Sequence, residues 1–229
     1  MLGSFGDISV FSFHQRKAIS TGDGGVACTA NKEYSEKLRR LRSFGDEELS
    51  YNYRMTEFAA ALGRVGLRKL DIENENRIES ARTLYEILKD KEWAKVRITN
   101  KSDKGVYYAI AIEVNLNDSM SEKLLSQMVG FGVPMRTVFS PLNKHPHFKS
   151  HKPARGLPWK HPQYQGKMKN LNYEDLVFPI SNEFCQGRVL ELYAHPGTNL
   201  AHLEAFAATL EKEYMRLYPG NTREKWTIS

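Results

Sequence analysis

The segment from residue 8 to residue 29 restricts the start of the chain to a pair of short strands. Residues 8–13 and 26–29 are rich in β-branched and aromatic side chains, which pack well on a pleated surface. The sequence Gly-Asp-Gly-Gly at 22–25 precedes the second run, and glycine readily adopts the backbone angles of tight turns. We therefore expect two strands joined across a turn, with Lys17 in the connection between them.

The rest of the chain alternates between helical and strand-like patterns, which predicts an α/β protein. A first helix is expected from Asn31, its N-cap, to Gly45, and a second, long or kinked helix from Phe58 to Asp90. The later segments are three strand-like runs at 96–98, 106–114 and 133–138, a helix at 121–129, and a last helix from about Asn199 to Pro219.

Composition and length fit a globular chain of the cytoplasm. The chain has 229 residues, 41% of them hydrophobic, and its apolar runs are far too short to span a bilayer. The N-terminus lacks the basic region and apolar stretch of a secretory signal. Cys28 and Cys185 have neither metal-ligand spacing nor the density of a disulfide framework. We expect no membrane contact and two reduced, buried thiols.

A basic, proline-rich stretch stands out in the second half of the chain. Residues 142–169 contain six Lys, one Arg and four His and no carboxylate, and their prolines exclude a regular helix or central strand. We expect a loop near the phosphates of a substrate, with a solvated surface loop as the alternative. Nucleic-acid binding is the weakest interpretation, because no nucleic-acid module is recognisable. His145, His147 and His151 lack an acidic or cysteine partner, so no metal site is expected.

Lys17 has two interpretations. As an exposed loop lysine it would only be solvated, and residues 22–25 would serve only a turn; general principles favour this interpretation. Held at a strand end, a desolvated amine, or one beside a cation such as Arg16 or His14, can instead attack a carbonyl carbon. The residues alone permit such a nucleophile and do not require one.

Two stretches together resemble one enzyme family. Residues 6–30, GDISVFSFHQRKAISTGDGGVACTA, and 51–62, YNYRMTEFAAAL, are similar to the sugar aminotransferases of the DegT/DnrJ/EryC1/StrS family, fold-type-I enzymes that depend on pyridoxal phosphate. The resemblance implies that Lys17 carries the cofactor and that Ser12 binds its phosphate. It also implies that Asn52 and Arg54 contact the cofactor phosphate or the substrate in the neighbouring subunit of a homodimer.

Each of these assignments has a structural alternative. Ser12 also suits a small core residue on a buried strand, and Asn52 and Arg54 suit a turn before the next helix. His14 receives only a supporting role, a hydrogen bond that closes the strand. The glycines at 22–25 are expected to serve backbone conformation and not phosphate binding, because no helix N-terminus follows them.

The chemistry that the family implies is the transfer of an amino group. Glutamate or glutamine is the usual donor, and a keto-sugar nucleotide or related cyclic ketone accepts the amine to give an amino sugar or amino-cyclitol. The freed amine of Lys17 is the base that moves the proton. Relatives that deoxygenate sugars carry histidine at this position, so the lysine favours transamination.

The chain also departs from the family pattern. Family members carry a large part of the catalytic domain before the segment that matches residues 3–7, whereas here Met1 lies just before it. That part holds the acidic partner of the cofactor's ring nitrogen, the ring stacked on the cofactor and a Gly-Thr turn at its phosphate. We therefore expect residues 1–90 to be the C-terminal part of the large domain with a connecting helix, and residues 91–229 to be an α/β small domain.

Two functional hypotheses follow. In the first, the chain is an incomplete aminotransferase that works as a homodimer or with a complementing N-terminal portion. In the second, it is a non-catalytic remnant that binds a full-length relative or a phosphorylated ligand. An in-frame continuation with the missing motifs upstream of Met1 would favour the first.

Overall fold

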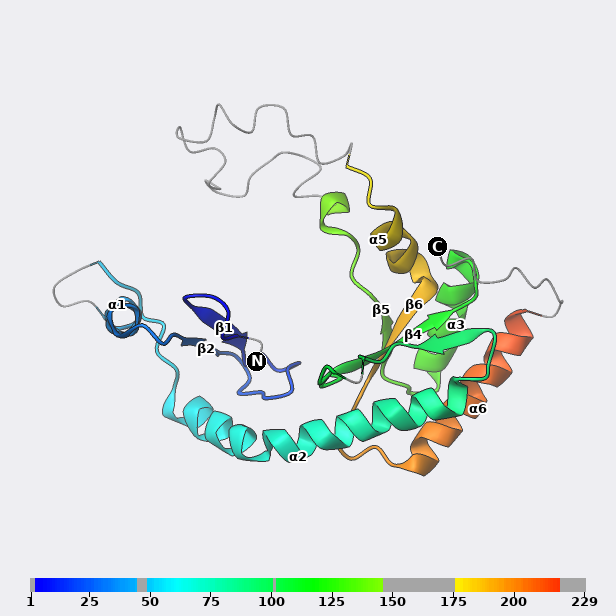
Figure 1. Cartoon of the computed structure of the whole chain (residues 1–229), viewed down its shortest axis with the longest axis horizontal. Coiled ribbons are helices and arrows are strands. Elements are labelled where there is room, and N and C mark those ends of the chain that lie inside the picture. The colour runs from blue at the N-terminus through cyan, green and yellow to red at the C-terminus, as the bar shows by residue number, and fades with distance from the viewer. Residues whose placement is uncertain (1–2, 45–48, 101, 146–175, 219–229) are drawn as a thin grey trace. The chain divides into compact units, whose positions relative to one another are not determined.

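The computed structural model describes residues 3–44, 49–100, 102–145 and 176–218 (Figure 1). The chain divides into two compact units, Met1–Asn76 and Arg77–Ser229, and helix α2 (Glu57–Leu88) belongs in part to each. The boundary expected after residue 90 falls just beyond the end of this helix. Most of the basic stretch, from residue 146 onward, lies outside the described residues.

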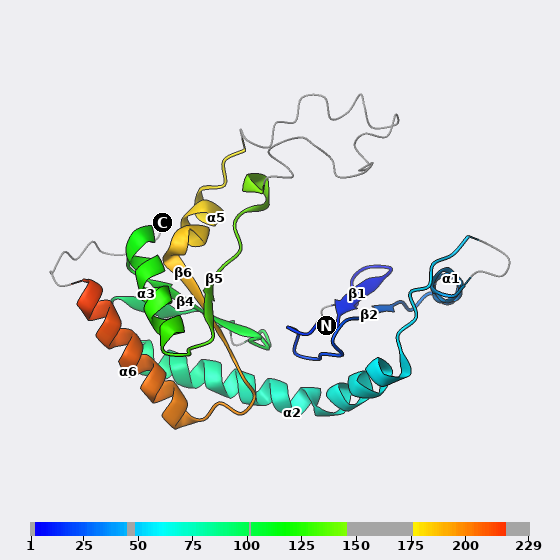
Figure 2. The same cartoon turned by 180° about the vertical axis from the view of Figure 1, so that it is seen from behind.

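The first unit is built on a two-stranded antiparallel sheet (Figures 1 and 2). Strands β1 (Ser9–Ser12) and β2 (Gly25–Cys28) pair along their whole length, which confirms the two predicted strands. Helix α1 (Lys32–Arg42) follows. The Tyr34 amide donates a hydrogen bond to the Asn31 side chain, which confirms the predicted N-cap.

The first unit leaves much of its apolar surface exposed. Every residue of β2 is exposed, and so are large side chains on β1 and on the N-terminal half of α2. The exposed fraction is 77% for Val10 and 87% for Phe58. Cys28 was expected to be buried but is exposed, as are the other residues of β2. Cys185 in the second unit is half-buried. A lone two-stranded sheet is at best marginally stable in water, so this surface is suited to burial against further protein.

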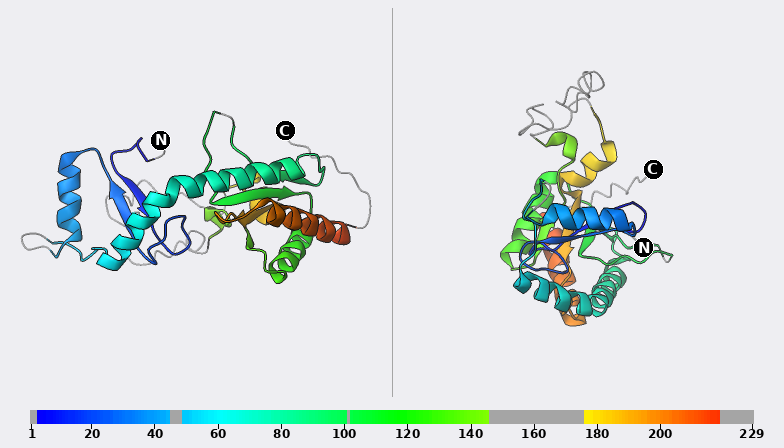
Figure 3. Two further views of the ribbon diagram at one scale, coloured as in Figure 1. Left: turned by 90° about the horizontal axis from the view of Figure 1, so that it is seen from below. Right: turned by 90° about the vertical axis from the view of Figure 1, so that its left-hand side faces the viewer.

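The second unit is a two-layer α/β structure. Its antiparallel sheet has the strand order β3–β4–β6–β5, and the strands are Ala94–Val96, Ala109–Val114, Val189–Tyr193 and Met135–Thr137 respectively. Strand side chains alternate between the faces, and the apolar face forms one core with α2, α3 (Asp118–Gly130) and α6 (Leu200–Leu217). Seen from below, α6 lies between α2 and α3 (Figure 3).

Three short helical segments complete the second unit. Segment η1 (Leu142–Lys144) follows β5, and α5 (Pro179–Glu183) and η4 (Phe184–Arg188) lead into β6. None of the helices in the described ranges combines the length and apolar character that crossing a bilayer requires.

The predicted elements of the second unit are largely confirmed. Asn199 caps α6 in a capping box with His202, as the sequence predicts for the start of the last helix. Strand β3 begins two residues earlier than predicted, because Ala94 pairs with Val114. Strand β6 was not predicted, although residues 189–193 alternate apolar side chains with Glu191.

A buried carboxylate lies on the polar face of this sheet. Glu113 on β4 is fully buried, and Arg97 Nη2 donates to its Oε2 at 2.5 Å. Arg188 Nε lies 3.0 Å from Oε1, an ion-pair contact that is not an aligned hydrogen bond. Burying an unpaired charge costs free energy, and the ion pairs with these two arginines offset that cost for the Glu113 carboxylate.

We expect the purified chain to self-associate through the apolar surface of the first unit. Sedimentation velocity should show species larger than the 26.3 kDa monomer, together with binding of a dye that reports exposed apolar surface. Replacing Val10 with Thr and Phe58 with Lys should weaken both signals, because these side chains are among the most exposed. A stable monomer without dye binding would contradict this prediction.

Candidate active site

Strand β1 ends at Ser12, opposite Gly25 on β2. A Cβ atom on residue 25 would lie 2.7 Å from the Phe11 carbonyl oxygen, so only glycine fits at this point of the hairpin. Beyond the strand, the Thr21 amide donates to the Phe13 carbonyl at 3.0 Å and closes the connection that contains Lys17. These contacts therefore fix the backbone at the end of β1, where the segment that leads to Lys17 begins.

The residues after Ser12 form a hydrogen-bonded turn that ends at Lys17. The His14 amide donates to Ser12 Oγ at 3.2 Å, and the Arg16 amide donates to His14 Nδ1 at 3.3 Å. The Lys17 amide donates to the His14 carbonyl at 2.8 Å. His14 thus closes the strand as predicted. Ser12 and Lys17 are both exposed, so Ser12 is not the buried core residue of the alternative interpretation.

The connection is anchored on α2 just after Lys17. Ile19 and Thr21 are 9% and 8% exposed, respectively. A Cβ on Gly66 would lie 2.8 Å from Ile19 Cγ2, and one on Gly63 would lie 3.3 Å from Thr21 Cγ2. The two glycines, one turn apart on α2, therefore allow this close approach. Glycines inside a helical pattern are a sequence signal of such close packing, so this role could have been predicted.

The glycine-rich turn has the structural role that the sequence predicts. Gly22 and Gly24 have φ angles of +85° and +136°, which side chains with a Cβ rarely adopt. A Cβ on Gly24 would also lie 2.9 Å from Met55 Cε. These glycines shape the backbone of the connection that holds Lys17.

The other two predicted site residues lie together on the segment before α2. Arg54 Nε donates to Asn52 Oδ1 at 3.1 Å, and the guanidinium carbon lies 4.2 Å from the centre of the Phe44 ring. The Tyr53 amide donates to the Arg42 carbonyl at 3.0 Å, which ties this segment to the end of α1. Asn52 and Arg54 are both exposed. The structure thus groups Ser12 with Lys17, and Asn52 with Arg54.

These residues have the chemistry to hold a phosphorylated aldehyde. Lys17 offers a primary amine on an anchored turn, and primary amines bond covalently to carbonyl carbons. The Ser12 oxygen accepts from the His14 amide, so its O–H can still donate to a phosphate. Arg54 adds a guanidinium, whose planar donors match phosphate oxygens. The amine, hydroxyl and guanidinium of these residues are therefore the types of group that can bind pyridoxal phosphate.

Proteins with related sequences include several that are named as transaminases or aminotransferases. The model of the DegT/DnrJ/EryC1/StrS aminotransferase family matches residues 1–210. The UDP-4-amino-4,6-dideoxy-N-acetyl-beta-L-altrosamine transaminase of Campylobacter jejuni is 42% identical over 104 residues, 41% of this chain and 26% of that protein. The GDP-perosamine synthase of Caulobacter vibrioides is 28% identical over 221 residues, 92% of this chain and 53% of that protein.

Solved structures show the same fold. The Helicobacter pylori aminotransferase PseC, involved in the biosynthesis of pseudoaminic acid, superposes with a TM-score of 0.72 at 22% identity, over 94% of this chain and 55% of that chain. The chain therefore has the α/β fold of about half of a fold-type-I sugar aminotransferase. It likewise spans about half the length of the perosamine synthase. The match of the family model over residues 1–210 shows that the chain belongs to the DegT/DnrJ/EryC1/StrS aminotransferase family.

Proposed function

We propose that this chain supplies the cofactor-binding lysine for pyridoxal-phosphate-dependent transamination of a keto-sugar nucleotide or a related cyclic ketone, which yields an amino sugar or amino-cyclitol. The observation that carries the proposal is the position of Lys17, exposed at the end of a hydrogen-bonded turn that begins at Ser12. Family membership supports the type of reaction. Relatives named as an altrosamine transaminase and a perosamine synthase support the class of substrate.

Four residues would hold the cofactor. The Lys17 amine would bond to its carbonyl carbon, and the Ser12 hydroxyl would donate to its phosphate. Asn52 and Arg54 would contact the phosphate or the substrate of a neighbouring subunit. When bound, pyridoxal phosphate supplies the electron sink that makes the carbon next to the amino nitrogen acidic.

Lys17 Nζ would also act as the base. Once the amino donor, glutamate or glutamine, has displaced it, the neutral amine takes a proton from the donor's α-carbon. In the second half-reaction the same nitrogen delivers a proton to the ketone carbon that receives the amine. Because Ile19 and Thr21 anchor the turn on α2, the amine can be released without losing its position.

Activity would require an assembly, either a homodimer or this chain with a complementing N-terminal portion. The exposed apolar side chains of the first unit and the match to about half of each relative support this requirement. The same exposed surface favours the second candidate function, a non-catalytic chain that binds a full-length relative or a phosphorylated ligand. The two cysteines, without the density of a disulfide framework, fit the cytoplasmic location that we propose.

Lys17 should be the lysine that bonds to pyridoxal phosphate. We would incubate the chain with the cofactor and with the N-terminal portion of a family member, reduce with borohydride and map the peptides. A pyridoxyl group is expected on Lys17, because this exposed amine ends the anchored turn. Lys17→Arg should abolish the label. A label on another lysine, with none on Lys17, would contradict the assignment.

Gly66→Ala should reduce this label without unfolding the second unit. The new Cβ would lie 2.8 Å from Ile19 Cγ2, so the turn that carries Lys17 must shift. Misplacing a reactive group by about 1 Å can cost roughly a hundredfold in rate, so we expect at least a tenfold slower labelling. Gly130→Ala is the matched control, because a Cβ there has no neighbour within 4 Å. Equal labelling rates in the two variants would refute the anchoring role of Gly66.

A further inference from the structure

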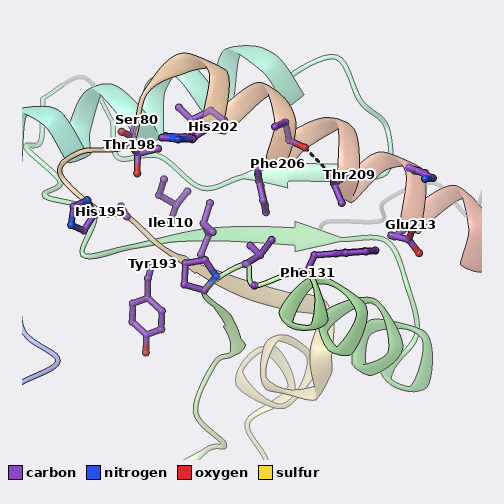
Figure 4. A pocket seen from close by; sticks show the side chains of 18 residues that line it. Ser80, Ile110, Phe131, Tyr193, His195, Thr198, His202, Phe206, Thr209 and Glu213 are labelled. Carbon is purple, nitrogen blue, oxygen red and sulfur yellow. Dashed lines mark hydrogen bonds between the residues drawn. The ribbon is translucent and has the colours of Figure 1, made fainter.

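The second unit contains a pocket that is lined entirely by residues of that unit. It has a volume of about 530 Å³ and is lined by α6, by the turn at residues 131–134 and by the end of β6 (Figure 4). Its lining is mostly apolar and includes Ile110, Leu192 and Phe206, with the exposed ring of Phe131 among them. Pockets of this size and composition are typical of small-molecule sites.

One carboxylate oxygen in this lining lacks a hydrogen bond. Glu213 on α6 is 3% exposed, and its Oε2 is buried with no hydrogen-bond partner in the part of the chain that the structure describes. Arg216 Nη1 lies 3.5 Å from this oxygen as an ion pair, but its side chain is 71% exposed. A buried carboxylate oxygen without a donor is unfavourable, so Glu213 is suited to a donor from a ligand.

Thr209 adds a second acceptor one turn before Glu213. Its hydroxyl donates to the Ala205 carbonyl at 2.8 Å, so its oxygen can only accept from a ligand. Figure 4 shows Thr209 and Glu213 on the side of α6 that faces Phe131. Arg216 forms an ion pair with this carboxylate and Lys212 lines the same pocket, so a neutral donor suits this end better than a further cation.

The opposite end of the pocket offers donors. His195 Nδ1 accepts from the Gly197 amide at 2.9 Å, and His202 Nδ1 accepts from the Asn199 amide at 3.4 Å. Because Nδ1 accepts in both rings, Nε2 is the ring nitrogen that can donate. Both rings line the pocket, so they can donate to a polar substituent at the far end of a ligand.

We propose that this pocket binds a small, uncharged aromatic molecule that carries a ring N–H or hydroxyl donor. The aromatic body packs on Phe131 and Phe206, which favour offset or edge-on ring contacts. The donor satisfies Glu213 Oε2, with Thr209 Oγ1 as the neighbouring acceptor.

The test compares indole with 1-methylindole, which lacks the N–H donor, by ligand-detected NMR titration of the full chain. Wild-type protein should bind indole about tenfold more tightly, because only indole can donate to the buried carboxylate. In Glu213→Met this preference should disappear while 1-methylindole still binds. Glu204→Met, an exposed position on the same helix, is the matched control and should keep the preference.

A second variant keeps the test decisive if Glu213→Met folds poorly. Ala205 is exposed and lines the pocket, so Ala205→Trp should fill it and abolish binding of both probes. The proposal is overturned if neither probe binds the wild type at millimolar concentration, if Glu213→Met retains the preference, or if Ala205→Trp binds as the wild type does. Lys17→Arg should bind both probes normally, which separates this site from the proposed transamination.

Discussion

Both units depend on helix α2, through two different kinds of contact. In the first unit, Gly63 and Gly66 remove side-chain bulk from the helix, so the connection after β1 can lie against it and hold Lys17 in place. In the second unit, Leu84 and Leu88 near the end of the helix are buried in the core with the sheet. The same helix therefore supports both units. In the first unit its glycines allow close packing, and in the second unit its large apolar side chains fill the core.

The two units differ in how much of their own apolar surface they bury. The second unit covers one face of its sheet with three helices and buries a continuous core. The first unit instead exposes its hairpin and the N-terminal half of α2. Relatives that this chain matches over most of its own length are about twice as long. The exposed side chains of the first unit are therefore the natural contact surface for the protein that we propose completes the site.

Local signals predicted most of the fold and part of the candidate site. The caps at Asn31 and Asn199 and the amphipathic helices were predictable because their signals lie within a few residues of sequence. Lys17 and Ser12 were found by family resemblance, since an exposed lysine has no distinctive pattern of its own. The role of Gly66 was missed because it depends on Ile19, which lies far away in the sequence. Strand order and the pocket at Glu213 likewise arise from long-range packing, which sequence periodicity does not report.

The central claim is that Lys17 both binds the cofactor and moves the proton in transamination. The most direct measurement follows the absorbance of pyridoxal phosphate in the assembled protein, this chain with an N-terminal portion of a family member, as glutamate and then glutamine are added. The account predicts that the band of the lysine-bound cofactor disappears with at least one donor, that the 2-oxo acid forms in equal amount, and that Lys17→Ala shows neither change at a comparable rate. An unchanged spectrum in the wild-type assembly, or an equally fast conversion in Lys17→Ala, would contradict it.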